Sequence, residues 1–112
     1  MHIGHHGYNH YWLDSLSEGE QKIEIEKGYN FLNNLGVNMG LWTICYPYGA
    51  YSNSVIQILQ DFNCKLGFTT KVDLANLVID DRFKLPRLDT NDIPKSNISL
   101  PNDWYLKISA PI

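Results

Sequence analysis

The sequence lacks several features that would by themselves decide its class. Its 112 residues include only two cysteines, Cys45 and Cys64, too few for a disulfide framework. No apolar run approaches the roughly 18 residues of a membrane-spanning helix, and Met1 is followed by histidines instead of a signal peptide's apolar segment. Nine basic residues stand against twelve acidic ones, and the net charge of −3 disfavours a nucleic-acid partner. We therefore expect no nucleic acid and no membrane span, with the cytoplasm and the cell envelope both open as locations.

What the sequence contains is typical of a folded chain. Hydrophobic residues make up 44% of it and charged residues 19%, so a core can form and disorder is disfavoured. The length predicts one small domain or part of a larger one. Residues 85–101 are rich in Pro, Asn, Asp and Ser, which predicts a loop.

A long helix is predicted over residues 18–35. Ser17 followed by Glu20 matches a capping box, and Gly36 stands where a glycine ends a helix. Gly28 inside the helix is expected to cost up to about 1 kcal/mol relative to alanine. Apolar positions at spacings of three and four predict one buried face: Ile25, Tyr29, Leu32 and Leu35. The charged positions are expected to be solvated: Glu18, Glu20, Lys22, Glu24, Glu26 and Lys27.

The next segments predict a strand, a helix and a strand. Residues 39–45 are apolar without a helical period, which predicts a buried strand, and residues 46–49 predict a loop. A second helix is expected after Ser52 or Asn53, then a strand over residues 65–69. This alternation is typical of a parallel sheet, whose strands are normally covered on both faces. Two helices cannot cover both faces, so we expect an α/β fold that is a piece of a larger barrel or sheet.

All four histidines lie near the amino terminus: His2, His5, His6 and His10. Imidazole is a common metal ligand, and the last two of these residues are four positions apart. Flanking glycines predict a strand end that turns into a loop. Two histidines do not complete a catalytic zinc site, which usually takes three protein ligands. A solvated loop is the alternative, and His2 and His5 are expected to be ordinary strand or surface residues.

Two short segments resemble motifs of a known family. Residues 3–10 read Ile-Gly-His-His-Gly-Tyr-Asn-His, and residues 45–49 read Cys-Tyr-Pro-Tyr-Gly. The first resembles the second motif of the polysaccharide deacetylase family, or NodB homology domain, whose two histidine positions are taken by His6 and His10. The second resembles the family's third motif, which is arginine, a variable residue and Pro-Tyr-Gly, with Cys45 at the arginine position.

A third segment extends the resemblance to about residues 3–94. Residues 85–92, Leu-Pro-Arg-Leu-Asp-Thr-Asn-Asp, resemble a run near the end of the domain in one branch of the family. Residues 67–70 fit the strand that precedes this run, while Gly7 stands where the family usually has Ser or Thr. The resemblance implies a partial, distorted (β/α) barrel of the polysaccharide deacetylase type. Residues 1–112 are then a single partial domain that lacks its amino-terminal strand or strands.

The resemblance also indicates what is missing. The family's first motif is an aspartate pair, of which one member is a metal ligand and the other the general base. Only Met1 precedes His2, so we expect a truncated reading frame, a fragment or one half of a split enzyme. No histidine follows His10 to act as the general acid of many members, and Cys45 removes the charge that normally tethers a catalytic aspartate.

In a complete domain, the resemblance implies a divalent metal held by one aspartate and two histidines. The histidines are His6 and His10, and zinc is the expected ion. The metal polarises an N-acetyl carbonyl and activates a water, the aspartate takes the proton, and the backbone N–H of Tyr48 holds the oxyanion. The general base is absent from this chain.

Substrate contacts are implied for the Pro47-Tyr48-Gly49 loop and for Arg87 and Asp89. For the last two residues, a structural loop anchor is an equal or better interpretation. For Tyr48 a turn residue is the alternative, and the oxyanion role is favoured because the other motifs accompany it. Five aromatic residues could stack on sugar rings or belong to the core: Tyr8, Tyr11, Trp12, Tyr46 and Tyr51. Cys64 is expected to be a buried small residue.

The implied activity is hydrolysis of linear amide bonds, by removal of acetyl groups from a carbohydrate. Peptidoglycan, chitin-like oligomers, exopolysaccharide and lipid-linked sugars all fit. Without the aspartate pair we expect little or no turnover by the chain alone. The alternatives are a split enzyme completed by an amino-terminal half, a glycan-binding module without catalysis, and a metal-free remnant. An open sheet edge further predicts instability or self-association.

Overall fold

The structure is a computed structural model, and it describes residues 1–92 of the chain. The helices and strands, in chain order, are α1 (Glu18–Asn34), β1 (Thr43–Cys45), α2 (Asn53–Asp61), β2 (Leu66–Val72) and β3 (Leu85–Arg87). Short 3-10 turns occur at Leu13–Ser15, Met39–Leu41, Pro47–Gly49 and Thr90–Asp92. The part of the predicted loop that follows Asp92, with Pro94, lies outside the described residues.

Helix α1 begins as the sequence predicts. The Ser17 hydroxyl accepts a hydrogen bond from the Glu20 N–H, and the Glu20 carboxylate accepts one from the Ser17 N–H. Gly36, with a φ of 86°, closes the other end. The prediction that Leu35 belongs to the buried face is wrong, because α1 ends at Asn34 and the Leu35 side chain is exposed.

The predicted strand over residues 39–45 is only partly confirmed. Its first half is a 3-10 turn at Met39–Leu41, capped by the Asn38 side chain, which accepts a hydrogen bond from the Gly40 N–H at 2.9 Å. The strand itself is β1. Helix α2 follows as predicted, with Ser52 as its amino-terminal cap.

The three strands form a parallel sheet in the order β1-β2-β3, as the alternation predicts. On the other edge of β1, His5 forms a parallel bridge to Ile44, so the histidine segment lies beside the sheet as a further short strand. The prediction of a loop from Leu85 onward is wrong at its start. Leu85 and Pro86 are buried, and the Thr69 hydroxyl donates to the Leu85 carbonyl at 3.0 Å, which fixes β3 against β2.

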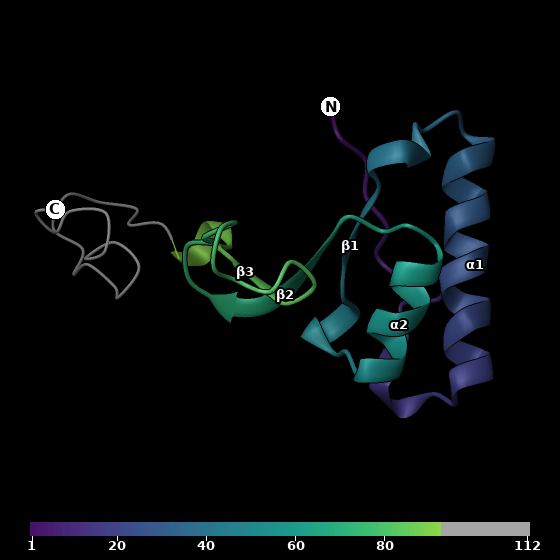
Figure 1. Cartoon of the computed structure of the whole chain (residues 1–112), viewed down its shortest axis with the longest axis horizontal. Coiled ribbons are helices and arrows are strands. Elements are labelled where there is room, and N and C mark those ends of the chain that lie inside the picture. The colour runs from purple at the N-terminus through teal and green to yellow at the C-terminus, as the bar shows by residue number, and fades with distance from the viewer. Residues whose placement is uncertain (93–112) are drawn as a thin grey trace, which may run out of the picture.

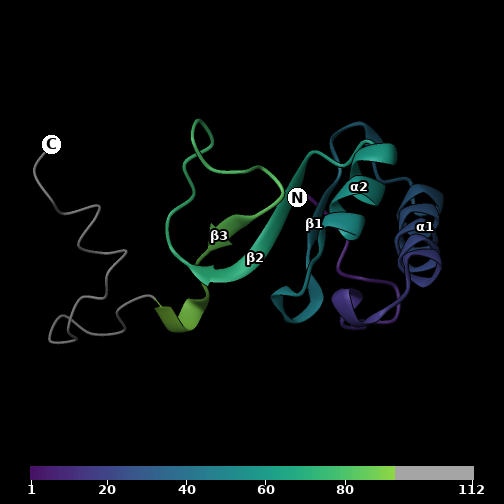
Figure 2. The same ribbon diagram turned by 60° about the horizontal axis from the view of Figure 1, so that its bottom comes forward.

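Both helices lie on the same side of β1, while β2 and β3 extend away from them (Figures 1 and 2). Within residues 1–92 the strands do not close, so the fold is a partial barrel. The core lies between the helices and β1. Its buried members are Leu13, Ile25, Trp42, Ile44, Tyr46, Val55, Leu59, Cys64 and Phe83.

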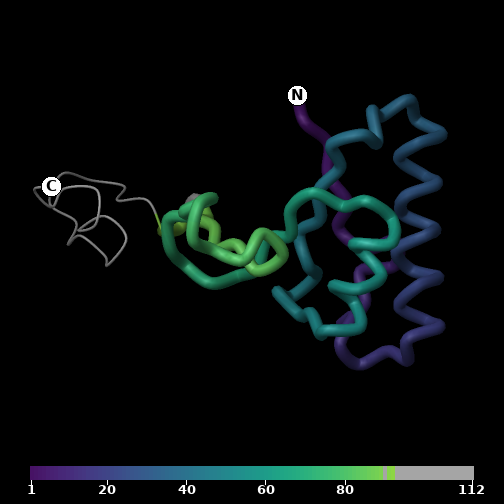
Figure 3. The backbone as a smooth tube through the Cα atoms, viewed as in Figure 1, coloured from purple at the N-terminus to yellow at the C-terminus, as the bar shows by residue number. Residues whose placement is uncertain are grey.

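We call residues 1–68 the body and residues 69–92 the arm. The backbone trace shows the arm projecting from the sheet side of the body, opposite α1 (Figure 3). Among the described residues, no helix is both long and apolar enough to cross a bilayer.

Candidate functional site

The two candidate ligands, His6 and His10, stand on a tight loop that follows the short strand at His5. Gly7 has a φ of 75° and His10 a φ of 58°, so both residues adopt the left-handed conformation. A Cβ on Gly7 would lie 2.8 Å from the Cγ of Pro47. This contact, with the positive φ, favours glycine at this position.

The rings of His6 and His10 face each other across this loop. The Nδ1–H of His6 donates to the main-chain carbonyl of Cys45 at 2.7 Å, since a carbonyl can only accept. The Nε2 of His6 is therefore free of its proton in the neutral ring and lies 3.0 Å from the Nε2 of His10. Without a metal, the Nε2 of His10 carries the proton between them.

This arrangement fits two of the ligands of a divalent metal. Zinc–nitrogen distances of about 2.0–2.1 Å place two tetrahedral ligand nitrogens about 3.3 Å apart, close to the spacing of the two Nε2 atoms. The Cys45 carbonyl supplies the second hydrogen bond that typically orients a ligating histidine. Among residues 1–92, however, no three histidine, cysteine or acidic side chains are grouped to hold a metal.

The chain's adjacent aspartates, Asp80 and Asp81, serve another purpose. Asp80 accepts from the N–H of Asn76 at 2.8 Å, and Asp81 accepts from the N–H of Phe83 at 2.9 Å. Both carboxylates thus stabilise turns in the arm.

The Pro47-Tyr48-Gly49 loop lies beside the histidine pair. Tyr48 has a φ of 59° and Gly49 a φ of 71°, and a Cβ on Gly49 would collide with the Thr70 side chain. Pro47 is buried, whereas the Tyr48 ring is half exposed. The Tyr48 ring is stacked on Trp12, at 4.3 Å and 2° between planes, and its centroid is 4.8 Å from that of His10.

Of the five candidate sugar-stacking rings, three are about half exposed: Tyr8, Tyr11 and Trp12. Tyr46 is fully buried and is not available to a sugar. Its hydroxyl donates to the Phe83 carbonyl at 2.6 Å, and burial raises its pKa well above the usual range. Tyr51 packs against the Tyr46 ring.

Arg87 and Asp89 lie at the end of β3 and line a groove of about 470 Å³ with Thr70. The Nε–H of Arg87 donates to the Thr69 carbonyl at 2.9 Å, and the N–H of Asp89 donates to the Asp92 carboxylate at 2.8 Å. Thr70 also packs against Gly49, so this groove borders the Pro-Tyr-Gly loop.

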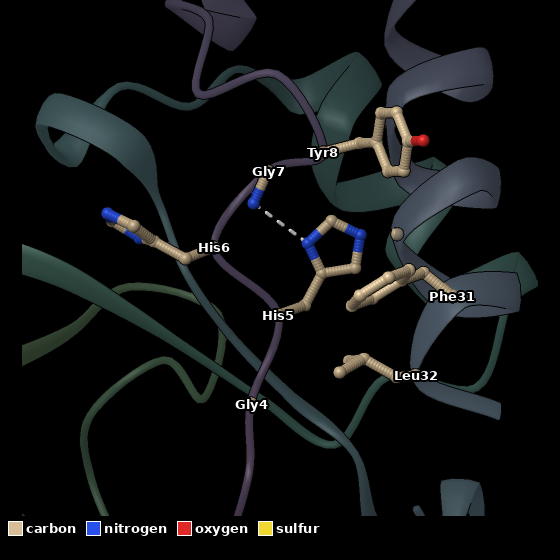
Figure 4. Close-up of a pocket in the computed structure, with 8 residues that line it drawn as sticks. Gly4, His5, His6, Gly7, Tyr8, Phe31 and Leu32 are labelled. Atoms are coloured by element: carbon tan, nitrogen blue, oxygen red, sulfur yellow. Dashed lines mark hydrogen bonds between the residues drawn. The ribbon is translucent and has the colours of Figure 1, made fainter. Parts of the chain in front are cut away.

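Two buried polar residues beneath the histidine loop were missed by the sequence analysis. His5 is only 3% exposed and faces α1, whereas His6 points away from it (Figure 4). His5 is thus a strand residue, as one of the two alternatives predicts, but the surface alternative is wrong because its ring packs onto Gly28. Glu24, expected to be solvated, is 4% exposed and accepts hydrogen bonds from Asn9.

His5 is held as a neutral ring. Its Nδ1 accepts from the Gly7 N–H at 2.9 Å (Figure 4), and its Nε2–H donates to the Ile25 carbonyl at 3.1 Å. Burial lowers the pKa of His5, against opposing effects of the Ile25 carbonyl and the Glu24 charge. A neighbouring groove of about 340 Å³ is lined by the His5 and Tyr8 rings and by Phe31 and Leu32 of α1.

Comparison with known proteins shows the family and the fold of the chain. Residues 1–67 match the polysaccharide deacetylase family. The fold is similar to that of the Streptococcus pyogenes deacetylase PplD, solved in complex with acetate (TM-score 0.67, 30% identity, 74% of this chain and 36% of that one). It is also similar to that of IcaB from Ammonifex degensii (TM-score 0.61, 24% identity, 80% and 42%). The chain therefore spans less than half the length of either structure. No curated protein matches it.

Proposed function

The chain belongs to the polysaccharide deacetylase family, and we propose that it is the metal-binding and oxyanion-holding part of a carbohydrate N-deacetylase. One observation carries this proposal. The Nε2 atoms of His6 and His10 converge to 3.0 Å while the Cys45 carbonyl fixes the His6 ring. Such a pair is suited to bind one ion from two sides.

His6 and His10 would hold a divalent ion, with zinc as the expected one. When bound, such an ion acts as a Lewis acid on an amide carbonyl and lowers the pKa of a bound water. For the ion to bind, His10 must move its proton from Nε2 to Nδ1. The third ligand and the general base would come from a complementing segment with the aspartate pair, since residues 1–92 hold no third ligand beside the histidines.

Tyr48 would supply the oxyanion donor through its main-chain N–H. A left-handed non-glycine residue is uncommon and costs about 1–3 kcal/mol, and such strain clusters at functional sites. The buried Pro47 and the positive-φ Gly49 fix the loop on either side. A donor held in place before the reaction is what stabilises developing negative charge.

The proposed substrate is a carbohydrate with N-acetyl groups, and the products are acetate and a free amine. The half-exposed Trp12 and Tyr48 rings offer apolar surface for a sugar ring beside the histidine pair. Arg87 and Asp89 line the adjoining groove, where they would contact a neighbouring sugar unit.

Zinc titration of the chain, followed by calorimetry, tests the proposal. We expect one zinc ion per chain, with at least tenfold weaker binding in His6→Ala and His10→Ala. His2→Ala is the matched control, because His2 is exposed and bonds only to the Thr43 hydroxyl in the described part of the chain. Equal binding by all variants would contradict the site.

Acetate release tests whether the chain needs a complementing half for activity. The chain alone should release little or no acetate from N-acetylated oligosaccharides, and adding a separately produced half with the aspartate pair should restore metal-dependent release. Metal-dependent turnover by the chain alone would show that it needs no complementing half.

A glycan-binding module without catalysis is the second candidate. It is favoured by the exposed Trp12–Tyr48 stack, which can bind a sugar ring without a metal. Binding of chitin oligomers should then persist in the presence of a chelator and fall in Trp12→Ala. Binding that disappears with the chelator would favour the metal-dependent enzyme.

A further inference from the structure

A buried carboxylate lies directly beneath the histidine loop. Glu24 of α1 is 4% exposed, and within residues 1–92 no lysine or arginine forms an ion pair with it. Its partners are instead the N–H groups of the loop itself. We infer that Glu24 is a positioning residue that sets the separation of His6 and His10, an inference that rests on the proposed function for its metal.

The contacts of Glu24 fall on the residue just before the second histidine. The main-chain N–H of Asn9 donates to one carboxylate oxygen at 2.8 Å, and its side-chain amide donates to the other. Hydrogen bonds to a charged acceptor are roughly twice as strong as those between neutral groups. Because Asn9 is held at both its backbone and its side chain, the next residue, His10, with its left-handed backbone conformation, is fixed in one orientation.

A second set of contacts from α1 holds the other side of the loop. The His5 ring spans from the Gly7 N–H to the Ile25 carbonyl, and it occupies the space that a side chain on Gly28 would fill. One helix therefore fixes the residue before His6 and the residue before His10. The distance between the His6 and His10 rings therefore depends on the position of α1 against the loop as well as on the strands.

Glu24→Ala is expected to weaken zinc binding about tenfold or more, since loss of an orienting partner typically costs 10–100-fold in metal affinity. Glu24→Gln should stay within about threefold of the unaltered chain. Its carbonyl can accept from the Asn9 N–H, and its amide can donate to the Asn9 side chain once that amide turns over. Glu26→Ala is the matched control, because Glu26 is an exposed acidic residue on the same helix.

A variant with a destabilised core separates positioning from general loss of stability. Val55→Ala removes buried methyl groups from α2, whereas the helix that bonds to the histidine loop is α1. It should lower the melting temperature and leave zinc affinity unchanged. If Val55→Ala weakens zinc binding as much as Glu24→Ala does, Glu24 has only a structural role. Zinc binding by Glu24→Ala equal to that of the unaltered chain would also overturn the inference.

A metal-free readout keeps this inference distinct from the proposed function. Nitrogen-15 NMR of the imidazole rings should show His6 with its proton on Nδ1 and His10 with its proton on Nε2, and ring-to-ring contacts between them. Glu24→Ala should lose the contacts, and Glu24→Gln should keep them. If the unaltered chain binds no zinc, the proposed function fails, and the same spectra still decide whether Glu24 positions the rings.

Discussion

The body and the arm differ in how much of their apolar surface is covered, although Phe83 and Leu85 of the arm are buried. In the body, Trp42, Ile44 and Leu59 are completely buried between the helices and β1. In the arm, Leu77 and Val78 are 70% and 91% exposed. The family match ends at residue 67, near the boundary between them. The difference teaches that the histidine site stands on a core formed mostly by the body and completed by Phe83, while the outer part of the arm exposes apolar side chains.

The strongest test of the body's packing is Gly28→Ala. The new Cβ would collide with the His5 ring, and overpacking of this kind costs about 1–3 kcal/mol. Gly19→Ala on the same helix meets open space and should raise stability by up to about 1 kcal/mol. Urea unfolding of both variants measures the contrast. Similar stabilities would mean that packing of the His5 ring against Gly28 does not fix the position of α1.

Tyr46→Phe tests the bond between body and arm. It removes the buried hydrogen bond to the Phe83 carbonyl and leaves that carbonyl without its partner, at a cost of roughly 1–3 kcal/mol. The Tyr51 hydroxyl makes no hydrogen bond in the described part of the chain, so Tyr51→Phe should cost under about 0.5 kcal/mol. Denaturant midpoints of the two variants give the stability that each one loses. Equal losses would mean that the Tyr46 hydrogen bond does not hold the arm to the body.

Acid should weaken the body through His5. Burial lowers the pKa of His5 in the folded chain, so the unfolded chain takes up a proton first as the pH falls. The stabilising contribution is complete above the unfolded pKa of about 6.5 and is lost as the pH falls through the lower, folded pKa. Denaturant midpoints measured between about pH 8 and pH 5 should therefore fall as the pH falls. This pH dependence of stability should persist in His2→Ala and disappear in His5→Gln.

Polar substitutions in the arm should have the smallest effect on folding. Leu77→Ser with Val78→Ser is expected to change stability by less than about 0.5 kcal/mol, because both side chains are exposed. The same variant should reduce self-association in analytical ultracentrifugation, since exposed apolar patches favour association. Leu41→Ser, a similarly exposed position in the body, is the control. If only this control reduces association, the arm is not the associating surface.

Local signals were enough to predict much of the body. The Ser17–Glu20 pair marked the start of α1, and the His6–His10 spacing marked the candidate ligands. Glu24 could not be recognised, because among neighbouring glutamates and lysines nothing marks the one that meets a loop 15 residues away. For His5 a signal was available in Gly28, since a glycine inside a good helix suggests that another group occupies the space of its side chain.

The arm was harder to predict. Pro86 and the polar residues after it indicated a loop, yet β3 forms because Leu85 and Pro86 are buried against β2. A strand this short is determined by its neighbour and not by its own composition. The exposed apolar residues of the arm likewise give no local sign of whether another surface covers them.

The tether of His6 has a consequence for mutational robustness. Its acceptor is the main-chain carbonyl of Cys45, a group that every amino acid supplies. Substitutions at position 45 can therefore change charge and size while this hydrogen bond survives, provided that β1 keeps its register. A histidine oriented by a side chain can lose its partner through one codon change, whereas the partner of His6 is part of the backbone.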